Sequence, residues 1–306
     1  MSQTLPLVSI VTPSYNQAQF IEETILSVLN QDYPNIEYII IDGGSTDGSV
    51  EIIRQYEDRL AYWVSEPDRG QSHAINKGWA RSNGPILAWL NSDDMYKPNA
   101  VSRAVTSLLA HPTAGMVYGN CESVDAQGKG LATKRPHSGA LSEWVKVKCW
   151  ISQPTVFLRR SVLQQAGLFV DEQLEVVMDY DLWLRMLVLA PAIYLDGEPL
   201  AIDRDYLARK THSLFARRMH EYLIVLQRFY EQYGERPELG QVRRQAFAWV
   251  YFRLASAALS EGRAFPDALR WLMKSVSLDI RPVWETKRHT MGILKHGLRQ
   301  MVLERR

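Results

Sequence analysis

The sequence contains little cysteine and no long apolar run, and these absences argue against several classes of protein. Its 306 residues include two cysteines, Cys121 and Cys149, which form no CxxC pair. Such usage argues against a disulfide-stapled scaffold and is typical of the reducing cytoplasm. No apolar run approaches the roughly 20 residues of a membrane-spanning helix. The first residues, MSQTLPLVSIVTPSYN, lack the basic region and apolar core of a signal peptide. We therefore expect a cytoplasmic protein.

An excess of charge of either sign is also missing. The 35 Lys and Arg residues nearly balance the 34 Asp and Glu residues, so the formal net charge is +1 and gives no support to nucleic-acid binding. The remaining composition, 46% hydrophobic and 23% charged, is ordinary for a soluble globular chain. A length of 306 residues allows one large domain with an appendage or two smaller domains.

The most informative stretch that is present runs from residue 85 to 96 and reads PILAWLNSDDMY. Its short apolar part is typical of a strand buried on both faces of a parallel sheet. Two adjacent carboxylates, Asp93 and Asp94, follow at the carboxyl end of that strand, where open α/β sheets bind ligands. Hard oxygen ligands favour Mg²⁺ or Mn²⁺, although a solvated acidic turn would have the same local sequence.

Similar apolar runs precede this strand and alternate with segments of helical period. Strands are predicted at residues 7–12, 36–41, 60–64 and 86–90. Helices are predicted at residues 20–30, from the turn that ends at residue 48 to about residue 56, and at residues 71–82. Strand–helix alternation with short links predicts right-handed crossovers and a parallel sheet. Because polar residues follow each strand, we expect residues 12–16, 42–47, 66–70 and 91–94 to share one edge of that sheet.

The glycine-rich turn at residues 43–48 lacks the spacing of a P-loop and of the dinucleotide-binding fingerprint. It is therefore interpreted first as a strand-to-helix turn that needs positive φ. Asp42, at the strand end, could accept hydrogen bonds from a base or a ribose. Asp47 is as well explained as a helix cap as a ligand.

Four segments, VSIVTPSYNQ, IIIDGGSTDGS, SEPDRGQSHAINKG and LAWLNSDDMY, together resemble family 2 inverting glycosyltransferases of the GT-A fold, of the bacterial non-processive type. Farther on, ISQPTVFLRR and DYDLWLRM resemble the acceptor half of the same family, so the resemblance covers about residues 5–210. It implies an α/β, Rossmann-like, mostly parallel sheet flanked by helices. It also implies a nucleotide-diphosphate-sugar donor, first a UDP-sugar, with Mn²⁺ or Mg²⁺ as cofactor. The acceptor would be a hydroxyl of a glycan or a lipid-linked molecule in cell-surface polysaccharide synthesis.

The resemblance also implies a role for individual residues. The metal ligands would be Asp93 and Asp94, and the catalytic base would be Asp179, with Asp181 as its competitor. Nucleotide-sugar binding would fall to Pro13, Tyr15, Asn16, Asp42, Asp68, Arg69, Asn76, Lys77, Asn91 and Ser92. A carboxylate such as Asp179 can take the proton of an attacking hydroxyl. In the purely structural interpretation, Asp179 is an acidic residue in the first turn of a helix, where the helix macrodipole favours negative charge.

The chain departs from the family pattern at two positions. Asn91 replaces the first Asp of the family's DxD element, and Tyr206 stands where relatives often carry a His that reaches the metal or the phosphate. His212 is close to that position but out of register. Nearby, Arg204, Arg209 and Lys210 are either diphosphate contacts or part of a solvated basic face.

From about residue 213 the pattern becomes helical, with predicted helices at residues 214–233, 240–261 and 266–277. We therefore expect a GT-A domain at residues 1–212 and a helical extension at residues 213–306. Within the domain, residues 1–100 would form the nucleotide-sugar half and residues 101–212 the acceptor half.

The end of the chain, residues 283–306, has apolar side chains at helical spacing. This tail contains six Lys or Arg and two Glu residues, a formal charge of +4. A basic amphipathic helix of this kind either lies on an anionic membrane or packs on the helical extension with its basic face in water.

The sequence features bear on three possible functions. A metal-dependent glycosyltransferase is favoured, and a catalytically inactive sugar-nucleotide-binding protein is the alternative, because of Asn91 and Tyr206. Slow release of nucleotide diphosphate with Mn²⁺ would separate the two. A nucleotidyltransferase should carry a Gly-rich, basic loop near its start, which TPSYNQ does not supply. Because the Gln-x-x-Arg-Trp element of processive relatives is absent from the sequence, one sugar per binding event is expected.

Overall fold

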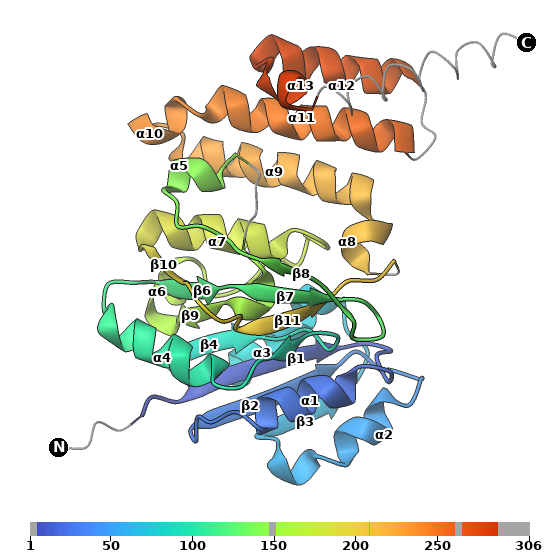
Figure 1. Cartoon of the computed structure of the whole chain (residues 1–306), viewed down its shortest axis with the longest axis vertical. Helices are drawn as coiled ribbons and strands as arrows, with labels where there is room; N and C mark the ends of the chain where they lie inside the picture. The colour runs from blue at the N-terminus through green and yellow to red at the C-terminus, as the bar shows by residue number, and fades with distance from the viewer. Residues whose placement is uncertain (1–4, 147–150, 208, 261–264, 287–306) are drawn as a thin grey trace, which may run out of the picture. The chain divides into compact units, whose positions relative to one another are not determined.

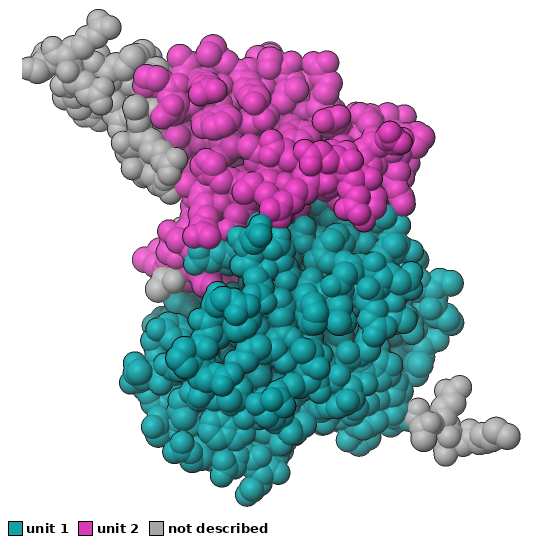
Figure 2. All heavy atoms as spheres, turned by 180° about the vertical axis from the view of Figure 1, so that it is seen from behind, with its two compact units in different colours: residues 1–138, 149–206 teal, residues 139–148, 207–306 magenta. Residues whose placement is uncertain are grey.

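The structure, a computed structural model, describes residues 5–146, 151–207, 209–260 and 265–286. The chain divides into two compact units (Figure 2). The first unit comprises residues 1–138 and 149–206, and the second comprises residues 139–148 and 207–306. The domain boundary expected after residue 212 stays a prediction.

Within its described residues, the first unit contains a seven-stranded sheet in the order β10-β6-β9-β4-β1-β2-β3 (Figure 1). Its strands are β1 (Val8–Ser14), β2 (Ile36–Asp42), β3 (Tyr62–Ser65), β4 (Ile86–Trp89), β6 (Met116–Gly119), β9 (Phe157–Arg159) and β10 (Ala192–Leu195). All neighbours are parallel except that β9 is antiparallel to β4 and to β6. The predicted mostly parallel sheet is therefore confirmed.

A second, four-stranded sheet in the same unit was not predicted. Its order is β5-β11-β7-β8, with β5 (Met95–Tyr96), β7 (Cys121–Val124), β8 (Gly130–Lys134) and β11 (Ala201–Arg204). Strand β11 pairs in parallel with β7 and antiparallel with β5. These pairings join segments that lie far apart in the sequence, and they bring the end of β11 toward the acidic residues that follow β4.

Helices cover both faces of the seven-stranded sheet. They are α1 (Ile21–Leu29), α2 (Ser49–Arg54), α3 (Gln71–Arg81), α4 (Ala100–Ala110), α6 (Arg160–Gln165) and α7 (Met178–Leu189), with short 3₁₀ helices at Glu57–Arg59 and Gln153–Thr155. Side chains alternate between the faces of a strand. Ile10 packs in the core cluster with residues of α1, α2 and α4. Val11, on the opposite face of β1, meets α3.

Helix α3 lies unusually close to β1 because Gly78 faces that strand. A Cβ added at Gly78 would lie 2.4 Å from Cγ1 of Val11, which is closer than real Cβ atoms approach another atom. The absence of a side chain at this position therefore sets the distance between α3 and the sheet. The same helix provides several of the residues expected in the site.

The described part of the second unit is helical. Its helices are α5 (Leu141–Trp144), α8 (Lys210–Ser213), α9 (Phe215–Tyr233), α10 (Pro237–Gly240), α11 (Arg243–Ser260), α12 (Phe265–Leu278) and α13 (Arg281–Glu285). Helices α11 and α12 bury a cluster that includes Trp249, Phe252 and Leu272. The predicted carboxyl-terminal helical region is confirmed, while residues 287–306 of the tail lie outside the described residues. None of the helices that the structure describes combines the length and the hydropathy needed to cross a membrane.

Candidate active site

The candidate site lies at the carboxyl ends of β1 and β4. From β1 the chain proceeds to β2 on one side, and β4 pairs with the other side of β1. The strand order therefore reverses between β1 and β4, and open α/β sheets bind ligands at such a switch point. The same parallel pairings place the residues that follow β1, β2, β3 and β4 at one edge of the sheet, as the sequence predicted.

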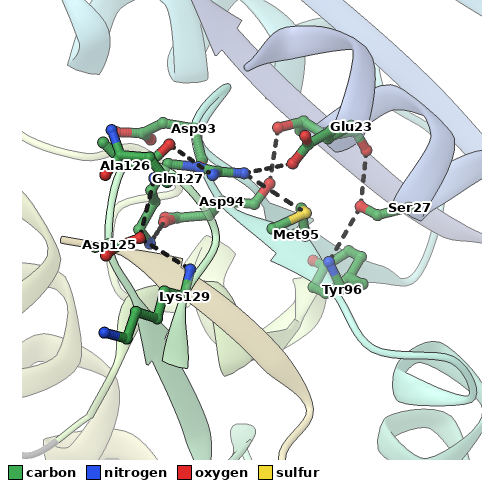
Figure 3. Close-up of polar contacts among 12 residues, drawn as sticks. Glu23, Ser27, Asp93, Asp94, Met95, Tyr96, Asp125, Ala126, Gln127 and Lys129 are labelled. Carbon is green, nitrogen blue, oxygen red and sulfur yellow. Dashed lines mark hydrogen bonds and ion pairs between the residues drawn. The ribbon is translucent and has the colours of Figure 1, made fainter. Parts of the chain in front are cut away.

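The acidic loop, defined as residues 91–94, carries the predicted metal ligands. Asp94 is 0% exposed, and its Oδ1 and Oδ2 accept hydrogen bonds from the Arg204 backbone N–H and from Asn91 Nδ2, each at 3.1 Å. Asp93 is 9% exposed, and its Oδ2 accepts a hydrogen bond from the Tyr206 hydroxyl at 2.9 Å. Oδ1 of Asp93 accepts no hydrogen bond from any described residue. Figure 3 shows both aspartates beside Ala126 and Met95.

The available oxygen of Asp93 fits a hard divalent cation. In the described part of the chain, no group of three or more His, Cys, Asp and Glu residues could hold a metal by itself. Ions such as Mg²⁺ are commonly held by one or two carboxylates together with substrate phosphates. A metal role for Asp94 stays a prediction, because both of its oxygens already accept hydrogen bonds.

Asn91 joins the acidic loop to two other segments through its amide group. Its Oδ1 accepts a hydrogen bond from Gln71 Nε2 at 2.7 Å, and its Nδ2 also donates to Gln153 Oε1 at 3.1 Å. Gln153 in turn donates to the carbonyl of Trp89 at 2.8 Å. A carboxylate at position 91 could not donate to Asp94 and would repel it. The neutral amide of Asn91 therefore suits a loop that contains the buried Asp94. Ser92, which follows Asn91, is also buried.

The loop that follows β1 is bonded to the glycine-rich turn that follows β2. Asn16, in a left-handed conformation with φ of 51°, accepts a hydrogen bond from Thr46 N–H and donates its own N–H to Ser45 Oγ. Asp47 accepts from Ala18 N–H. Partial burial raises the pKa of Asp47, but the hydrogen bonds from Ser49 and Ala18 outweigh burial and hold that pKa below its usual range.

Asp42 has the geometry of a structural residue. It is 0% exposed, and its carboxylate accepts hydrogen bonds from Gly44 N–H, Ser45 N–H, Ser45 Oγ and Ser65 Oγ. A carboxylate has about four lone-pair sites, so these bonds use its capacity. Its predicted contact with the base or ribose stays a prediction, which this arrangement does not favour.

The residues at the end of β1 differ in exposure. Pro13 is buried within the strand, whereas the Tyr15 side chain is 63% exposed and open to stacking against a planar group. Ser14 is 3% exposed, and its Oγ has no hydrogen-bond partner among the described residues. Because an unpaired buried hydroxyl costs about 1–3 kcal/mol, Ser14 is a further candidate for a ligand contact. No sequence motif marked it.

The predicted residues around α3 serve mainly to hold neighbouring segments. Asp68 accepts from Gly70 N–H at 2.7 Å, and its carboxylate lies against Gly43, where an added Cβ would be 2.9 Å from Oδ2. The exposed Arg69 forms an ion pair with Glu172, and Lys77 forms one with Glu66.

Asn76 fixes the segment that leads to the predicted base. Its Nδ2 donates to the carbonyl of Val170 and its Oδ1 accepts from Val170 N–H, each at 3.0 Å. Ser72, one turn earlier on α3, donates to the carbonyl of Leu174 at 3.1 Å. Asn76 is 9% exposed, so its nucleotide-sugar role stays a prediction alongside this structural one.

Asp179 lies in the first turn of α7, and a tryptophan stack connects that helix to β4. Trp183 of α7 stacks on Trp89 of β4 with ring centroids 5.3 Å apart, and Trp79 of α3 packs edge-on against Trp89 at 5.4 Å. All three rings are at least 99% buried. Since Trp89 is two residues before Asn91, the stack joins the helix that carries Asp179 to the strand that ends in the acidic loop.

The two aspartates of α7 differ in their partners. Asp181 forms an ion pair with Arg185 at 2.9 Å, and Arg185 also donates to the backbone carbonyls of Ala166 and Phe169. Asp179 is half-buried, and its Oδ1 accepts from Tyr180 N–H at 2.7 Å. The ion pair gives Asp181 a structural explanation, which favours Asp179 as the base.

The sequence left two roles open for Arg204, a diphosphate contact and part of a solvated basic face, and the structure rules out the second. Its side chain is 3% exposed and forms an ion pair with Glu23, so it belongs to no solvated basic face. Its N–H groups donate to the carbonyls of Asp93 and Ala126. This arginine therefore supports the acidic loop from within the protein, and only the second sheet brings it there.

Comparison with known proteins places this geometry in a family context. Residues 9–166 match Glycosyl transferase family 2. An uncharacterized glycosyltransferase of Rickettsia typhi is 32% identical over 215 residues, covering 68% of this chain and 67% of that protein. A Bacillus subtilis glycosyltransferase named for teichuronic acid biosynthesis is 38% identical over 117 residues, 37% of this chain and 46% of its own length. The chain spans only 29% of a Rickettsia bellii glycosyltransferase that is 34% identical over 205 residues.

Two solved structures share the fold. Residues 1–349 of S. aureus TarS, in complex with UDP-GlcNAc, match with a TM-score of 0.62 at 15% identity, covering 93% of this chain and 92% of that chain. The mannosyltransferase PcManGT from Pyrobaculum calidifontis, in complex with GDP-Man and Mn²⁺, matches with a TM-score of 0.62 at 20% identity, covering 93% of this chain and 89% of that chain. At these identities the likeness establishes the fold alone, a central sheet flanked by helices as in GT-A glycosyltransferases.

Proposed function

Because this chain belongs to glycosyl transferase family 2, we propose that it moves one sugar from a nucleotide-diphosphate sugar to a hydroxyl of a glycan or lipid-linked acceptor, with inversion of the anomeric carbon. The observation that carries the proposal is the Asp93 carboxylate, which stands at the switch point with Oδ1 available. Exposed Tyr15 and the unpaired hydroxyl of Ser14 flank the same switch point at the end of β1.

The donor would lie along the shared edge of the sheet. Tyr15 and Asn16 would contact the base and ribose, with Pro13 behind them and Asp42 shaping the turn beneath. A UDP-sugar is the first choice, supported by the TarS complexes with UDP-GlcNAc and UDP, although PcManGT is in complex with GDP-Man. The remaining predicted donor residues would act at the diphosphate and sugar end: Asp68, Arg69, Asn76, Lys77, Asn91 and Ser92. This assigns residues 1–100 to the donor and residues 101–212 to the acceptor.

Asp93 would be the principal ligand of Mn²⁺ or Mg²⁺, and Asp94 would contribute through the loop geometry that it fixes. When bound, such a cation neutralises the charge that develops on the diphosphate. The Mn²⁺ in the PcManGT complex supports a divalent metal for this fold. The protein's own part is to hold Asp93 at the strand end.

Asp179 would act as the general base. A sugar hydroxyl is a poor nucleophile, and a carboxylate within hydrogen-bond reach can take its proton as it attacks. Attack from the face opposite the diphosphate inverts the anomeric carbon. The stack of Trp183 on Trp89 supports this role, because it fixes α7 relative to β4.

The cellular role that we propose is cell-surface polysaccharide synthesis in the cytoplasm. The Bacillus subtilis relative named for teichuronic acid biosynthesis supports the pathway class. Residues 283–306 would bring the enzyme to the inner membrane face, where a lipid-linked acceptor would be found. Exposed Trp284, 57% accessible at the start of this tail, is suited to a membrane interface.

The proposal is tested with a panel of UDP- and GDP-sugars in the presence of Mn²⁺. Binding is measured by thermal shift, and donor hydrolysis is measured by release of nucleotide diphosphate. A ligand at about 100 times its Kd stabilises the folded state by about 2.7 kcal/mol, so at least one sugar nucleotide should raise the melting temperature. Slow donor hydrolysis should accompany it. If no member of the panel either binds or is hydrolysed, the proposal is wrong.

The alternative is an inactive sugar-nucleotide-binding protein. Asn91 and Tyr206 motivate it, because they depart from the family pattern at the first Asp of the DxD element and at the His that often reaches the metal or the phosphate. Binding without release of nucleotide diphosphate, across both metals and a range of hydroxyl acceptors, would favour this alternative.

A further inference from the structure

Tyr206 contacts the acidic loop although 113 positions separate it from Asp93. Its hydroxyl donates to Oδ2 of Asp93 at 2.9 Å, and the Asp93 carboxylate accepts no other hydrogen bond from the described residues. One oxygen of this carboxylate is therefore held and the other is left available. Asp93 is 9% exposed, so the available oxygen has a restricted path to solvent.

Arg204 fixes the backbone to which Tyr206 belongs. Its backbone N–H donates to Asp94 Oδ1 at 3.1 Å, and its Nε donates to the carbonyl of Asp93 at 3.3 Å. The guanidinium also forms an ion pair with Glu23 of α1. Figure 3 shows Glu23 on one side of this network and Asp93 and Asp94 on the other. Arg204 thus acts on the main chain of the loop, and Tyr206 acts on the Asp93 side chain.

Phe20 supports both residues from the start of α1. The Arg204 guanidinium lies 4.5 Å from the Phe20 ring centroid, and the Tyr206 ring lies 5.4 Å from it at an angle of 51°. Phe20 is 6% exposed, so the Tyr206 ring packs against a buried surface. This contact restricts the rotamers of Tyr206 and aims its hydroxyl at the acidic loop. The phenol is therefore oriented before any ligand binds.

We propose that Tyr206 is a positioning residue for Asp93, holding Oδ2 so that Oδ1 faces the divalent cation of the donor site. The inference rests on the proposed function. A carboxylate that can rotate loses orientational freedom when it binds a cation, and a hydrogen bond made in advance reduces that loss. Partners that orient metal ligands in this way typically change metal affinity by about 10–100-fold when they are removed.

The test compares Mn²⁺ binding by wild type and Tyr206→Phe, measured by electron paramagnetic resonance with Mn²⁺ alone and with Mn²⁺ plus UDP. Phenylalanine keeps the ring against Phe20 and removes only the hydroxyl. We expect the Kd for Mn²⁺ to rise about 10–100-fold, while UDP binding without metal and the melting temperature stay the same. The matched control is Tyr194→Phe, which removes a hydroxyl bonded to Asn120 and Asp196 instead. It should bind Mn²⁺ like wild type.

Asp93→Asn separates failure of this inference from failure of the proposed function. If Asp93→Asn loses Mn²⁺ binding while Tyr206→Phe binds as wild type does, the positioning role is overturned and the metal site stands. If neither variant changes Mn²⁺ binding, Asp93 is not the metal ligand, and both the positioning role of Tyr206 and the proposed metal site are overturned. A weakened Tyr206→Phe beside an unchanged Tyr194→Phe supports the inference.

Discussion

At the scale of single residues, the site depends on how two adjacent carboxylates, Asp93 and Asp94, are accommodated in a buried loop. Asp94 is fully buried, and its carboxylate accepts hydrogen bonds from the neutral amide of Asn91 and from the backbone N–H of Arg204. The amide of Asn91 donates to Asp94 and accepts from Gln71 in the same network. The departure from the family's first Asp is thus explained by the packing of this chain.

Asn91→Asp should therefore destabilise the protein in metal-free buffer. The new carboxylate would lie about where the amide nitrogen is now, 3.1 Å from Asp94 Oδ2, and would leave Asp94 without that donor. Losing a buried hydrogen bond of this kind costs about 1–3 kcal/mol. Two like charges at this distance raise the pKa of the pair. The loss in the free energy of unfolding should therefore be largest at pH 7 and smaller near pH 4.

Urea unfolding of Asn91→Asp at both pH values provides the measurement. Asn91→Ser is the control, since it removes the amide without adding charge and should show the same loss at both pH values. An Asn91→Asp protein as stable as wild type at pH 7 would contradict this account of the loop.

At the scale of elements, α3 is the support on which the site is assembled. It approaches β1 at Gly78, holds the segment before α7 through Asn76, and contributes Trp79 to the tryptophan stack. The sequence predicted α3 and its position after β3 because both follow from local periodicity. It could not predict that Asn76 would bond to Val170, since that contact joins segments 94 residues apart.

Gly78→Ala should destabilise the first unit. The added methyl group would meet Val11 at 2.4 Å, and overpacking of this kind costs about 1–3 kcal/mol. Thermal unfolding of the variant measures the effect. The matched control, Gly130→Ala, places its Cβ 3.9 Å from the nearest atom, Glu122 Oε1, and should unfold like wild type. Equal stability of the two variants would show that α3 does not depend on this close approach.

The ion pair between Arg69 and Glu172 makes the stability contributed by the segment before α7 depend on pH. Partial burial raises the pKa of Glu172, but hydrogen bonds from Asn76 and Arg69 outweigh burial and hold that pKa below its usual range. A depressed pKa contributes stability above the unfolded value, near 4.3 for glutamate, which is lost as the pH falls through the folded value.

Glu172→Gln should accordingly lower the free energy of unfolding by about 0.5 kcal/mol at pH 7, as expected for a partly exposed pair, and by nothing measurable at pH 3. Urea titrations at the two pH values test this. Glu51→Gln, at an exposed position of α2, is the control and should show no such difference. A constant deficit for Glu172→Gln across the pH range would contradict the ionic contribution.

At the scale of the whole molecule, the sequence predicted the features that follow from local patterns and missed those that depend on pairing between distant segments. The seven-stranded sheet and its common edge followed from alternating strands and helices. The second sheet, by contrast, pairs β11 with β5 and β7, and no local pattern encodes those pairings. The sequence therefore could not predict that Arg204 and Tyr206 hydrogen-bond to the acidic loop, although the fold places both against it.

The tail, residues 283–306, carries a formal charge of +4. Each Lys or Arg near an anionic leaflet contributes about 1 kcal/mol of attraction that salt screens. The full chain should therefore sediment with anionic vesicles at low salt and be released at high salt. A chain lacking residues 283–306 should bind less at low salt. Neutral phosphatidylcholine vesicles are the control, and equal sedimentation of the two chains with anionic vesicles would refute the idea.

The central claim, that this site transfers a sugar with Asp179 as its base, is tested most directly by the transfer rates of Asp179→Asn and Asp181→Asn. Both would be measured with Mn²⁺ and a donor identified in the screen. Asp179→Asn should lose about 10²–10⁴-fold in rate while donor binding and the melting temperature stay close to those of wild type. Folded Asp181→Asn should retain transfer, because the ion pair of Asp181 with Arg185 gives this carboxylate a structural role. Full turnover by Asp179→Asn, or loss of transfer in a folded Asp181→Asn alone, would contradict the account.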